Sequence, residues 1–425
     1  MSLAVPRRER LAFAAGDTGF NFVWQTIELY LLSYYVRILE LSPAVAAGIF
    51  LAGGIVDLAG DPLIGALVDR LRGRISARTW MLIAGPPLGL TLALAFLAPP
   101  FEGPGAVGFL AVTHVLMRLC YSLGNIPYAT LTARITENPA EQVRLTATRM
   151  QGAALGGLLA AGIYNLLPLS KQWYGVPLGA IVLGLAAQPF FLITWAGVRE
   201  RVVLTSDPVG IDRQLSGFSL LLRKSGLLRR LLLLIFFAGL STTVLHKGLL
   251  FVFDRLDARE WGYAATVVPS VALFAGAPIW AALARRDGRV KVLQFAALFH
   301  LLAIGTAWIA ESSPILIAGL ISLAIFASAG LSTMFWSLVP GVIEACEARI
   351  ASEGCAARIY GLANLARKLG QAVAPLALTL PLMLPGEDVL SGMAMAALFA
   401  MAAVLGLAPR RGELRSAREN PRRSD

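Results

Sequence analysis

The stretch AVAAGIFLAGGIVDLAGDPLIGALV, residues 44–68, decides the fold. It is apolar along its whole length apart from Asp57 and Asp61. About 20 such residues in an α-helix cross the ~30 Å hydrocarbon core of a bilayer. Apolar runs of similar length recur along the chain, whereas a membrane β-barrel shows alternating segments of about 10 residues. We therefore predict an all-α integral membrane protein.

The composition agrees with a membrane protein and argues against other classes. The chain has 425 residues, of which 57% are hydrophobic and 15% charged, whereas soluble proteins carry about 25% charged residues. The net charge is +11, but the basic residues lie between apolar spans and no nucleic-acid motif accompanies them. Walker A, HExxH, CxxC and GxSxG motifs are absent from the sequence. We expect no enzyme activity, no cofactor other than a coupling ion, and no nucleic-acid partner.

Hydropathy predicts twelve transmembrane helices and an uncleaved first span. The expected spans are 11–36, 44–68, 80–98, 106–131, 145–167, 176–196, 230–253, 263–284, 292–310, 314–343, 358–384 and 390–408. Of the 37 Lys and Arg residues, 28 fall on the side of the N-terminus and four on the other side. Cytoplasmic loops carry the excess of positive charge. We therefore expect both termini in the cytoplasm of a bacterium, and the protein in its inner membrane.

An internal repeat predicts two halves. The run Gly60 to Leu67 closes the second span, and Gly276 to Leu283 closes the eighth, with Gly, Pro, Ala and Leu in register. Two six-helix halves related in parallel are the plan of the major facilitator fold. The expected parts are an N-terminal bundle with the cation site, a cytoplasmic linker, a C-terminal bundle and a basic cytoplasmic tail, at 1–196, 197–229, 230–408 and 409–425.

The first span carries a polar stripe. Asp17, Asn21, Gln25 and Glu28 follow one another at spacings of 4, 4 and 3, which puts them on one helical face. Polar groups inside a membrane face the bundle interior and mark solute or ion pathways. The stripe therefore predicts a lining for a central cavity. Interhelical hydrogen bonding is the alternative.

The second span carries two acids one turn apart, Asp57 and Asp61. In a low dielectric both cannot stay ionised unless a cation neutralises them. A bound Na⁺ would satisfy both, or one carboxyl would hold a proton. The alternative is pairing with basic residues of other spans, such as Lys368. Cation coupling is the favoured interpretation.

Further polar residues lie within other spans. Arg118, Ser122 and Asn125 share one face of the fourth span, and Asn125-Ile126-Pro127 predicts a break or kink. Arg149 lies near the start of the fifth span, where it either faces the interior or snorkels to the interface. The remaining intramembrane basic residues are Lys247 in the seventh span and Arg367 and Lys368 in the eleventh.

Several motifs carry a family resemblance. They are Gly16-Asp17-Thr18-Gly19-Phe20-Asn21, Asp57-Leu58-Ala59-Gly60-Asp61-Pro62, Asn125-Ile126-Pro127-Tyr128-Ala129-Thr130-Leu131, Arg144-Leu145 to Arg149, and Tyr360-Gly361-Leu362 to Arg367-Lys368-Leu369-Gly370. Together and in this order, over nearly the whole chain, they resemble the glycoside–pentoside–hexuronide:cation symporters of the major facilitator superfamily.

The resemblance implies roles for particular residues. It implies that Asp57 and Asp61 bind Na⁺ or H⁺ with help from Ser122. It also implies substrate binding by Asp17 and Arg149, a place for Asn125 in the substrate or coupling site, and coupling by Lys368. The residues that we add as substrate candidates from the polar stripe and from the aromatic and basic side chains are Asn21, Gln25, Arg118, Lys247 and Trp336.

Arg118 and Lys247 lie outside the family's pattern, and the sequence shows no evident acidic partner for them. This favours a substrate with a carboxylate, phosphate or sulfonate group, since a guanidinium binds such groups bidentately. Pairing with Glu28 or Glu344 is the alternative.

The expected function is cation-coupled symport of a sugar-like or hexuronide-like solute by a monomer. The alternatives are transport of an amphipathic anion such as a lysophospholipid, and a non-transporting sensor or assembly factor.

Overall fold

The computed structural model describes residues 5–71, 74–136, 138–166, 175–202, 222–223, 225–310, 313–350, 356–381 and 388–407. The expected basic tail at 409–425 and most of the expected linker lie outside these residues. All regular structure within them is helical. Eight helices among the described residues are long and apolar enough to cross a bilayer. Each of the twelve expected spans falls on a helical segment, so the all-α prediction is confirmed.

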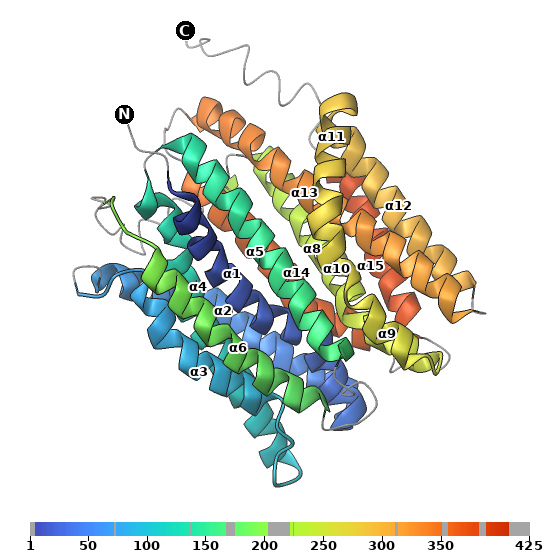
Figure 1. Ribbon diagram of the computed structural model, residues 1–425. Helices are drawn as coiled ribbons and strands as arrows, with labels where there is room; N and C mark the ends of the chain where they lie inside the picture. Colours follow the sequence, from blue (N-terminus) through green and yellow to red (C-terminus); the bar gives the residue numbers. More distant parts are fainter. Residues whose placement is uncertain are drawn as a thin grey trace. The chain divides into compact units, whose positions relative to one another are not determined.

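The chain divides into two compact units, Met1–Pro208 with Leu249–Val271, and Val209–Gly248 with Ala272–Asp425. Helices of both are drawn in Figure 1. Unit 1 contains α1 (Arg7–Thr26), the π-helical turns η1 (Ile27–Leu31) and η2 (Tyr34–Ile38), α2 (Pro43–Arg70), α3 (Thr79–Ala95), α4 (Pro104–Ile135), α5 (Pro139–Leu166), α6 (Gly175–Gly197), α9 (Arg259–Ala265) and α10 (Val268–Val271).

Unit 2 contains η4 (Ala272–Gly276), α11 (Ala277–Asp287), α12 (Arg289–Ile309), α13 (Pro314–Ile350), α14 (Ala356–Thr379) and α15 (Val389–Leu407). Helix α8 (Gly226–Arg255) contributes residues to both units. Its last turns and α9 and α10 group with unit 1, although the sequence placed them in the C-terminal bundle. Hydrogen bonds within unit 1 explain this: Tyr30 donates to Thr266 at 2.8 Å, and Asn165 donates to the Tyr263 carbonyl at 2.8 Å.

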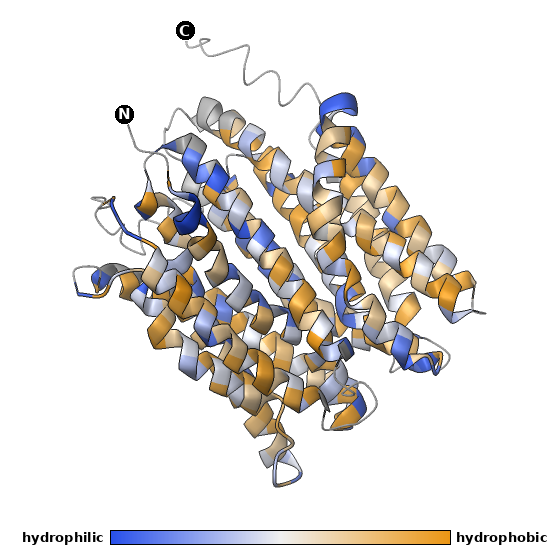
Figure 2. Ribbon diagram, in the orientation of Figure 1, coloured by the Kyte–Doolittle hydropathy of each residue, from blue (hydrophilic) through white to orange (hydrophobic). Residues whose placement is uncertain are grey.

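Proline and glycine set the helix boundaries. Pro43, Pro104, Pro139 and Pro314 each occupy the first position of a helix, where the missing N–H costs nothing. Gly288 separates α11 from α12 with a φ of 91°, a conformation that favours glycine. In Figure 2 the helices are coloured mainly as hydrophobic along their length, and hydrophilic residues lie at helix ends, for example at one end of α11. The break predicted at Pro127 does not occur, since α4 continues through it to Ile135, and the kink given as the other outcome stays a prediction.

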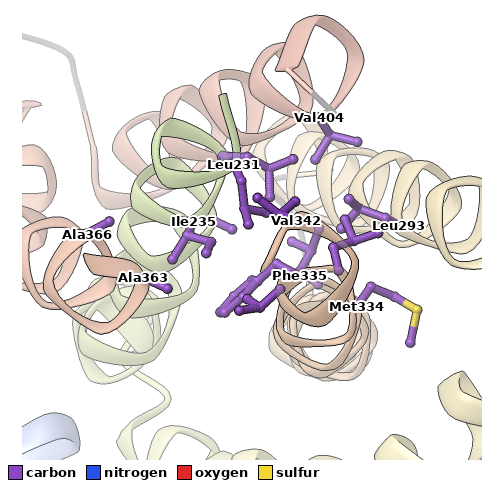
Figure 3. Packing of buried hydrophobic residues seen from close by; sticks show 14 of the residues in the cluster. Leu231, Ile235, Leu293, Met334, Phe335, Val342, Ala363, Ala366 and Val404 are labelled. Atoms are coloured by element: carbon purple, nitrogen blue, oxygen red, sulfur yellow. The ribbon is translucent and has the colours of Figure 1, made fainter. Parts of the chain in front are cut away.

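Apolar side chains cover the outer faces of the helices. Leu63, Leu90, Leu185 and Ile309 are exposed in their helices. In water such a surface would be a liability, but in a bilayer these side chains contact lipid tails. The core of unit 2 packs α8, α12, α13, α14 and α15 around Leu231, Leu293, Phe335 and Val342 (Figure 3).

Small residues let α1 and α5 lie close together in unit 1 (Figure 1). A Cβ on Gly152 would stand 2.4 Å from the Ala14 carbonyl oxygen, and one on Gly156 would stand 2.6 Å from the Thr18 carbonyl oxygen. Close backbone approach at small residues is the usual basis of helix packing in membranes. It brings the polar stripe of α1 directly against α5.

One end of unit 1 is joined by an ionic network. Arg201 donates to both carboxylate oxygens of Glu9, at 2.9 and 2.7 Å. The Glu9 hydrogen bond raises the pKa of Arg201 above its ordinary value. Arg134 pairs with Glu200 at 3.3 Å, and Arg78 donates its backbone N–H to Glu200 at 3.1 Å. The chain after α6 is thereby tied to the starts of α1 and α3 and to the end of α4.

Replacing Gly152 by Ala tests the close approach of α1 and α5. The added methyl would overlap the Ala14 carbonyl, and overpacking costs about 1–3 kcal/mol. We expect a lower melting temperature in detergent. Gly162→Ala is the matched control in the same helix, because a Cβ there meets nothing within 4 Å. The control is expected to keep or raise the melting temperature, since Ala favours a helix over Gly by about 1 kcal/mol. Equal behaviour of the two variants would contradict this packing.

Candidate functional site

Two polar contacts join α2 to α4 in unit 1. Arg118 of α4 forms an ion pair with Asp57 of α2, and Ser122 donates a hydrogen bond to Asp61 at 2.7 Å. Both pairs link residues 61 positions apart. The two helices therefore run side by side in register, and residues four apart on each helix form successive contacts. Asp57 and Ser122 are buried, and Arg118 is largely so.

Arg118 also lies over an aromatic ring of α1. Its guanidinium carbon is 5.2 Å from the centroid of the Trp24 ring. A cation over the face of Trp is attracted by the ring quadrupole. The Arg118 charge is thus held from two sides, by the Asp57 carboxylate and by the Trp24 ring.

This contact corrects one argument made from the sequence. The sequence favours an anionic substrate for Arg118, because no acidic partner is evident, with pairing to Glu28 or Glu344 as the alternative. Its partner in the structure is Asp57, so this acid pairs with a basic residue of another span, which the sequence offered as the alternative to a bound cation. The side chain of Glu344 lies outside the described ones, and a substrate role for Arg118 stays a prediction.

A second charged pair joins α1 to α5. The Nε of Arg149 lies 3.3 Å from Asp17, and the guanidinium carbon is 5.1 Å from the centroid of the Tyr128 ring. Asp17 is buried, whereas the Arg149 side chain is 26% exposed. The Tyr128 hydroxyl donates to the Phe13 carbonyl at 2.7 Å, which fixes the ring beneath the guanidinium. The pairing indicates that Arg149 faces the protein interior at this point.

The rest of the polar stripe follows the same side of α1. A Cβ on Gly156 would lie 2.8 Å from Cβ of Asn21, and one on Gly157 would lie 3.4 Å from Cγ of Gln25. Asn21 donates to the Asp17 carbonyl at 2.9 Å. Asp17, Asn21 and Gln25 thus share a face, as their spacing predicts. Glu28 is buried one turn further along, in η1.

The other candidate residues have different surroundings. Asn125 is half-buried on α4, three residues beyond Ser122. Lys247, Trp336 and Lys368 belong to unit 2. Lys247 is buried, Lys368 is half-buried, and Trp336 stacks on Tyr360 with ring centroids 6.4 Å apart. The structure therefore brings together the candidates of α1, α2, α4 and α5, and the roles of the unit 2 candidates stay predictions.

Sequence reasoning missed Trp24 and Tyr128, which lie against the two arginines. Trp24 follows Asn21 by three residues and precedes Glu28 by four, so it shares the face of the polar stripe. That spacing could have identified it. Tyr128 lies within the quoted motif of the fourth span, but nothing in the sequence indicates that its ring meets Arg149.

The sequence matches the MFS/sugar transport protein family over residues 12–406. The chain belongs to this family. The resemblance to sugar symporters of the major facilitator superfamily is thereby confirmed, and the protein is a membrane transporter rather than an enzyme. It is 28% identical to an uncharacterised symporter, YnaJ, of Bacillus subtilis, over 86% of this chain and 80% of that protein.

Other relatives carry more specific names. The chain is 27% identical to a putative 2,3-dihydroxypropane-1-sulfonate exporter of Escherichia coli, over 88% of this chain and 82% of that protein. A putative sulfoquinovose importer of the same organism is 29% identical, over 49% of this chain and 46% of that protein.

Solved structures show the same fold. The nucleoside transporter NupG superposes with a TM-score of 0.70 at 13% identity, over 97% of this chain and 99% of that one. The inward-open xylose transporter XylE of E. coli gives 0.68 at 13% identity, over 96% and 98%. The major facilitator fold expected from the internal repeat is confirmed.

Replacing Asp17 by Asn tests the ion pair of α1 and α5. The change would leave the Arg149 guanidinium without its carboxylate. Breaking a fully buried pair costs about 3–5 kcal/mol, and because Arg149 is 26% exposed we expect on the order of 1–3 kcal/mol. The measurement is the melting temperature together with substrate uptake, and both should fall.

A double variant and a surface variant complete this experiment. Asp17→Asn with Arg149→Gln should be more stable than Asp17→Asn alone, because no uncompensated charge remains. Arg259→Gln is the control, since the Arg259 side chain is 68% exposed, its partner Asp254 is not buried, and exposed pairs contribute about 0–1 kcal/mol. Additive losses in the double variant would contradict the pairing.

Proposed function

We propose that this transporter is a cation-coupled symporter that accumulates a small, sugar-like solute by alternating access. The observation that carries the proposal is the pair of carboxylates on α2, Asp57 and Asp61, each held by a polar group of α4. Acids inside a membrane are costly and mark ion pathways or proton relays. The names of relatives such as the putative glycoside/cation symporter YagG of E. coli support the same function.

The proposed solute site is built around Asp17 and Arg149. A carboxylate and a guanidinium side by side offer acceptors and donors to sugar hydroxyls. The Arg149 guanidinium can also bind a carboxylate or sulfonate group of the solute. Two relatives are named for sulfonated solutes, dihydroxypropanesulfonate and sulfoquinovose. We therefore propose a polyhydroxylated solute, sugar-like or hexuronide-like, with an acidic group as the favoured variant.

The arrangement in the membrane is part of the proposal. The asymmetry of Lys and Arg between the two sides supports cytoplasmic termini. We propose that the transporter works as a monomer in a bacterial inner membrane. The solute and the lipid bilayer are its partners, and nucleic acid is not one of them.

Uptake into proteoliposomes tests the coupling. The panel should contain hexuronides, sulfonated sugars, neutral glycosides and a lysophospholipid, each with an inward Na⁺ gradient, an inward H⁺ gradient, or neither. We expect accumulation of a sugar-like solute only when an ion gradient is imposed. Accumulation that needs no gradient, or a response to the lysophospholipid alone, would contradict the proposal.

Asp61→Asn should separate coupling from movement of the solute. The variant loses the carboxylate that Ser122 holds, so we expect loss of gradient-driven accumulation while exchange of labelled for unlabelled solute continues. Asp287→Asn is the matched control, because Asp287 is exposed at the end of α11. Undiminished accumulation by Asp61→Asn would show that Asp61 is not part of the coupling site.

A further inference from the structure

The Asp57 carboxylate is already engaged by a positive charge from the protein itself. Arg118 reaches it from α4, while the second acid of α2, Asp61, accepts a hydrogen bond from a hydroxyl at the equivalent position of α4, that of Ser122. The two acids therefore differ in kind. One is paired with a cation that is covalently part of the chain, and the other accepts a hydrogen bond from a neutral group.

The positive charge of Arg118 is permanent. A guanidinium does not deprotonate in proteins. It can leave Asp57 only if the side chain moves, and the Trp24 ring at 5.2 Å favours its present position. A small cation that approached Asp57 would meet the guanidinium at the oxygen it needs, and would be repelled by its charge.

Sodium would need the oxygens of both acids. A hard cation is held by several oxygen ligands, and carboxylates supply the charge that compensates its lost hydration. Asp61 and Ser122 alone offer one carboxylate and one hydroxyl. The second carboxylate, one helical turn away, is engaged by Arg118.

We propose that the guanidinium of Arg118 takes the place of Na⁺ at Asp57. The transporter therefore does not use Na⁺. A neutral residue at position 118 creates a Na⁺ site. This inference rests on the proposed cation coupling and concerns which ion is selected. Arg118 acts through Asp57 and is a determinant of ion specificity. The loss of its guanidinium leaves two carboxylates one turn apart with no charge from α4 between them, which is the arrangement that attracts a monovalent metal ion.

Thermal stability in NaCl against choline chloride at equal ionic strength and fixed pH tests the inference. The wild-type protein should show the same melting temperature in both salts. Arg118→Gln should show a saturable rise of about 3 °C or more in Na⁺, because a ligand that binds only the folded state stabilises it. Arg118→Gln combined with Asp57→Asn should lose this rise.

Arg118→Lys is the matched control, since it keeps a positive charge beside Asp57. We expect no Na⁺ response from it. A saturable Na⁺ response of the wild-type protein, or equal responses of Arg118→Gln and Arg118→Lys, would overturn the inference.

Uptake by the wild-type protein gives a second readout if Arg118→Gln does not fold. Replacing Na⁺ by choline at a constant pH gradient should leave the initial rate within about twofold, and a loss of tenfold or more would overturn the inference. Failure of the proposed function has a different signature, which is absence of accumulation under every ion gradient. The salt dependence of the melting temperature still reports on Arg118 in that case.

Discussion

Compensation of charge inside the hydrocarbon core is the constraint on which the rest of the structure depends. An ionised side chain at the centre of a membrane helix costs at least ~2.5–3.5 kcal/mol, and an uncompensated one in a protein interior costs more. Here Asp57 is compensated by Arg118, which lies against Trp24. Helices α1, α2 and α4, which carry these three residues, must therefore keep a fixed register relative to one another. The same contact makes the two acids of α2 chemically different, although the sequence presents them as equals.

The two charged pairs are connected through α1 and α4. Helix α1 contributes Trp24 to the first pair and Asp17 to the second. Helix α4 contributes Arg118 to the first pair and Tyr128 to the second, where its ring lies beneath Arg149. Ring contacts of Trp24 with Tyr121, of Tyr121 with Phe20 and of Phe20 with Tyr128 join the two pairs. The proposed ion site and the proposed solute site are thus linked by packed side chains. Coupling between the two ligands must be reciprocal, because it is a free energy shared by both.

The fold and much of the site could be predicted from the sequence. Hydropathy predicted the spans, and a spacing of four residues placed Asp17, Asn21 and Gln25 on one face. Both features can be predicted because each is a property of a single helix. The pairing of Arg118 with Asp57 could not be predicted, because it depends on the register between α2 and α4. Hydropathy carries no information on that register. The continuation of α4 through Pro127 was likewise not predicted, because membrane helices tolerate Pro that would end a helix in water.

A double-mutant cycle on Asp57 and Arg118 tests the central claim most directly. The unfolding free energies of Asp57→Ala, Arg118→Ala and the double variant are measured in the same detergent. Because each single change leaves one buried charge without its partner, we predict that the double variant is more stable than either single one, with a coupling energy of about 1–3 kcal/mol. Losses that simply add would contradict the claim that Arg118 neutralises Asp57 within the membrane.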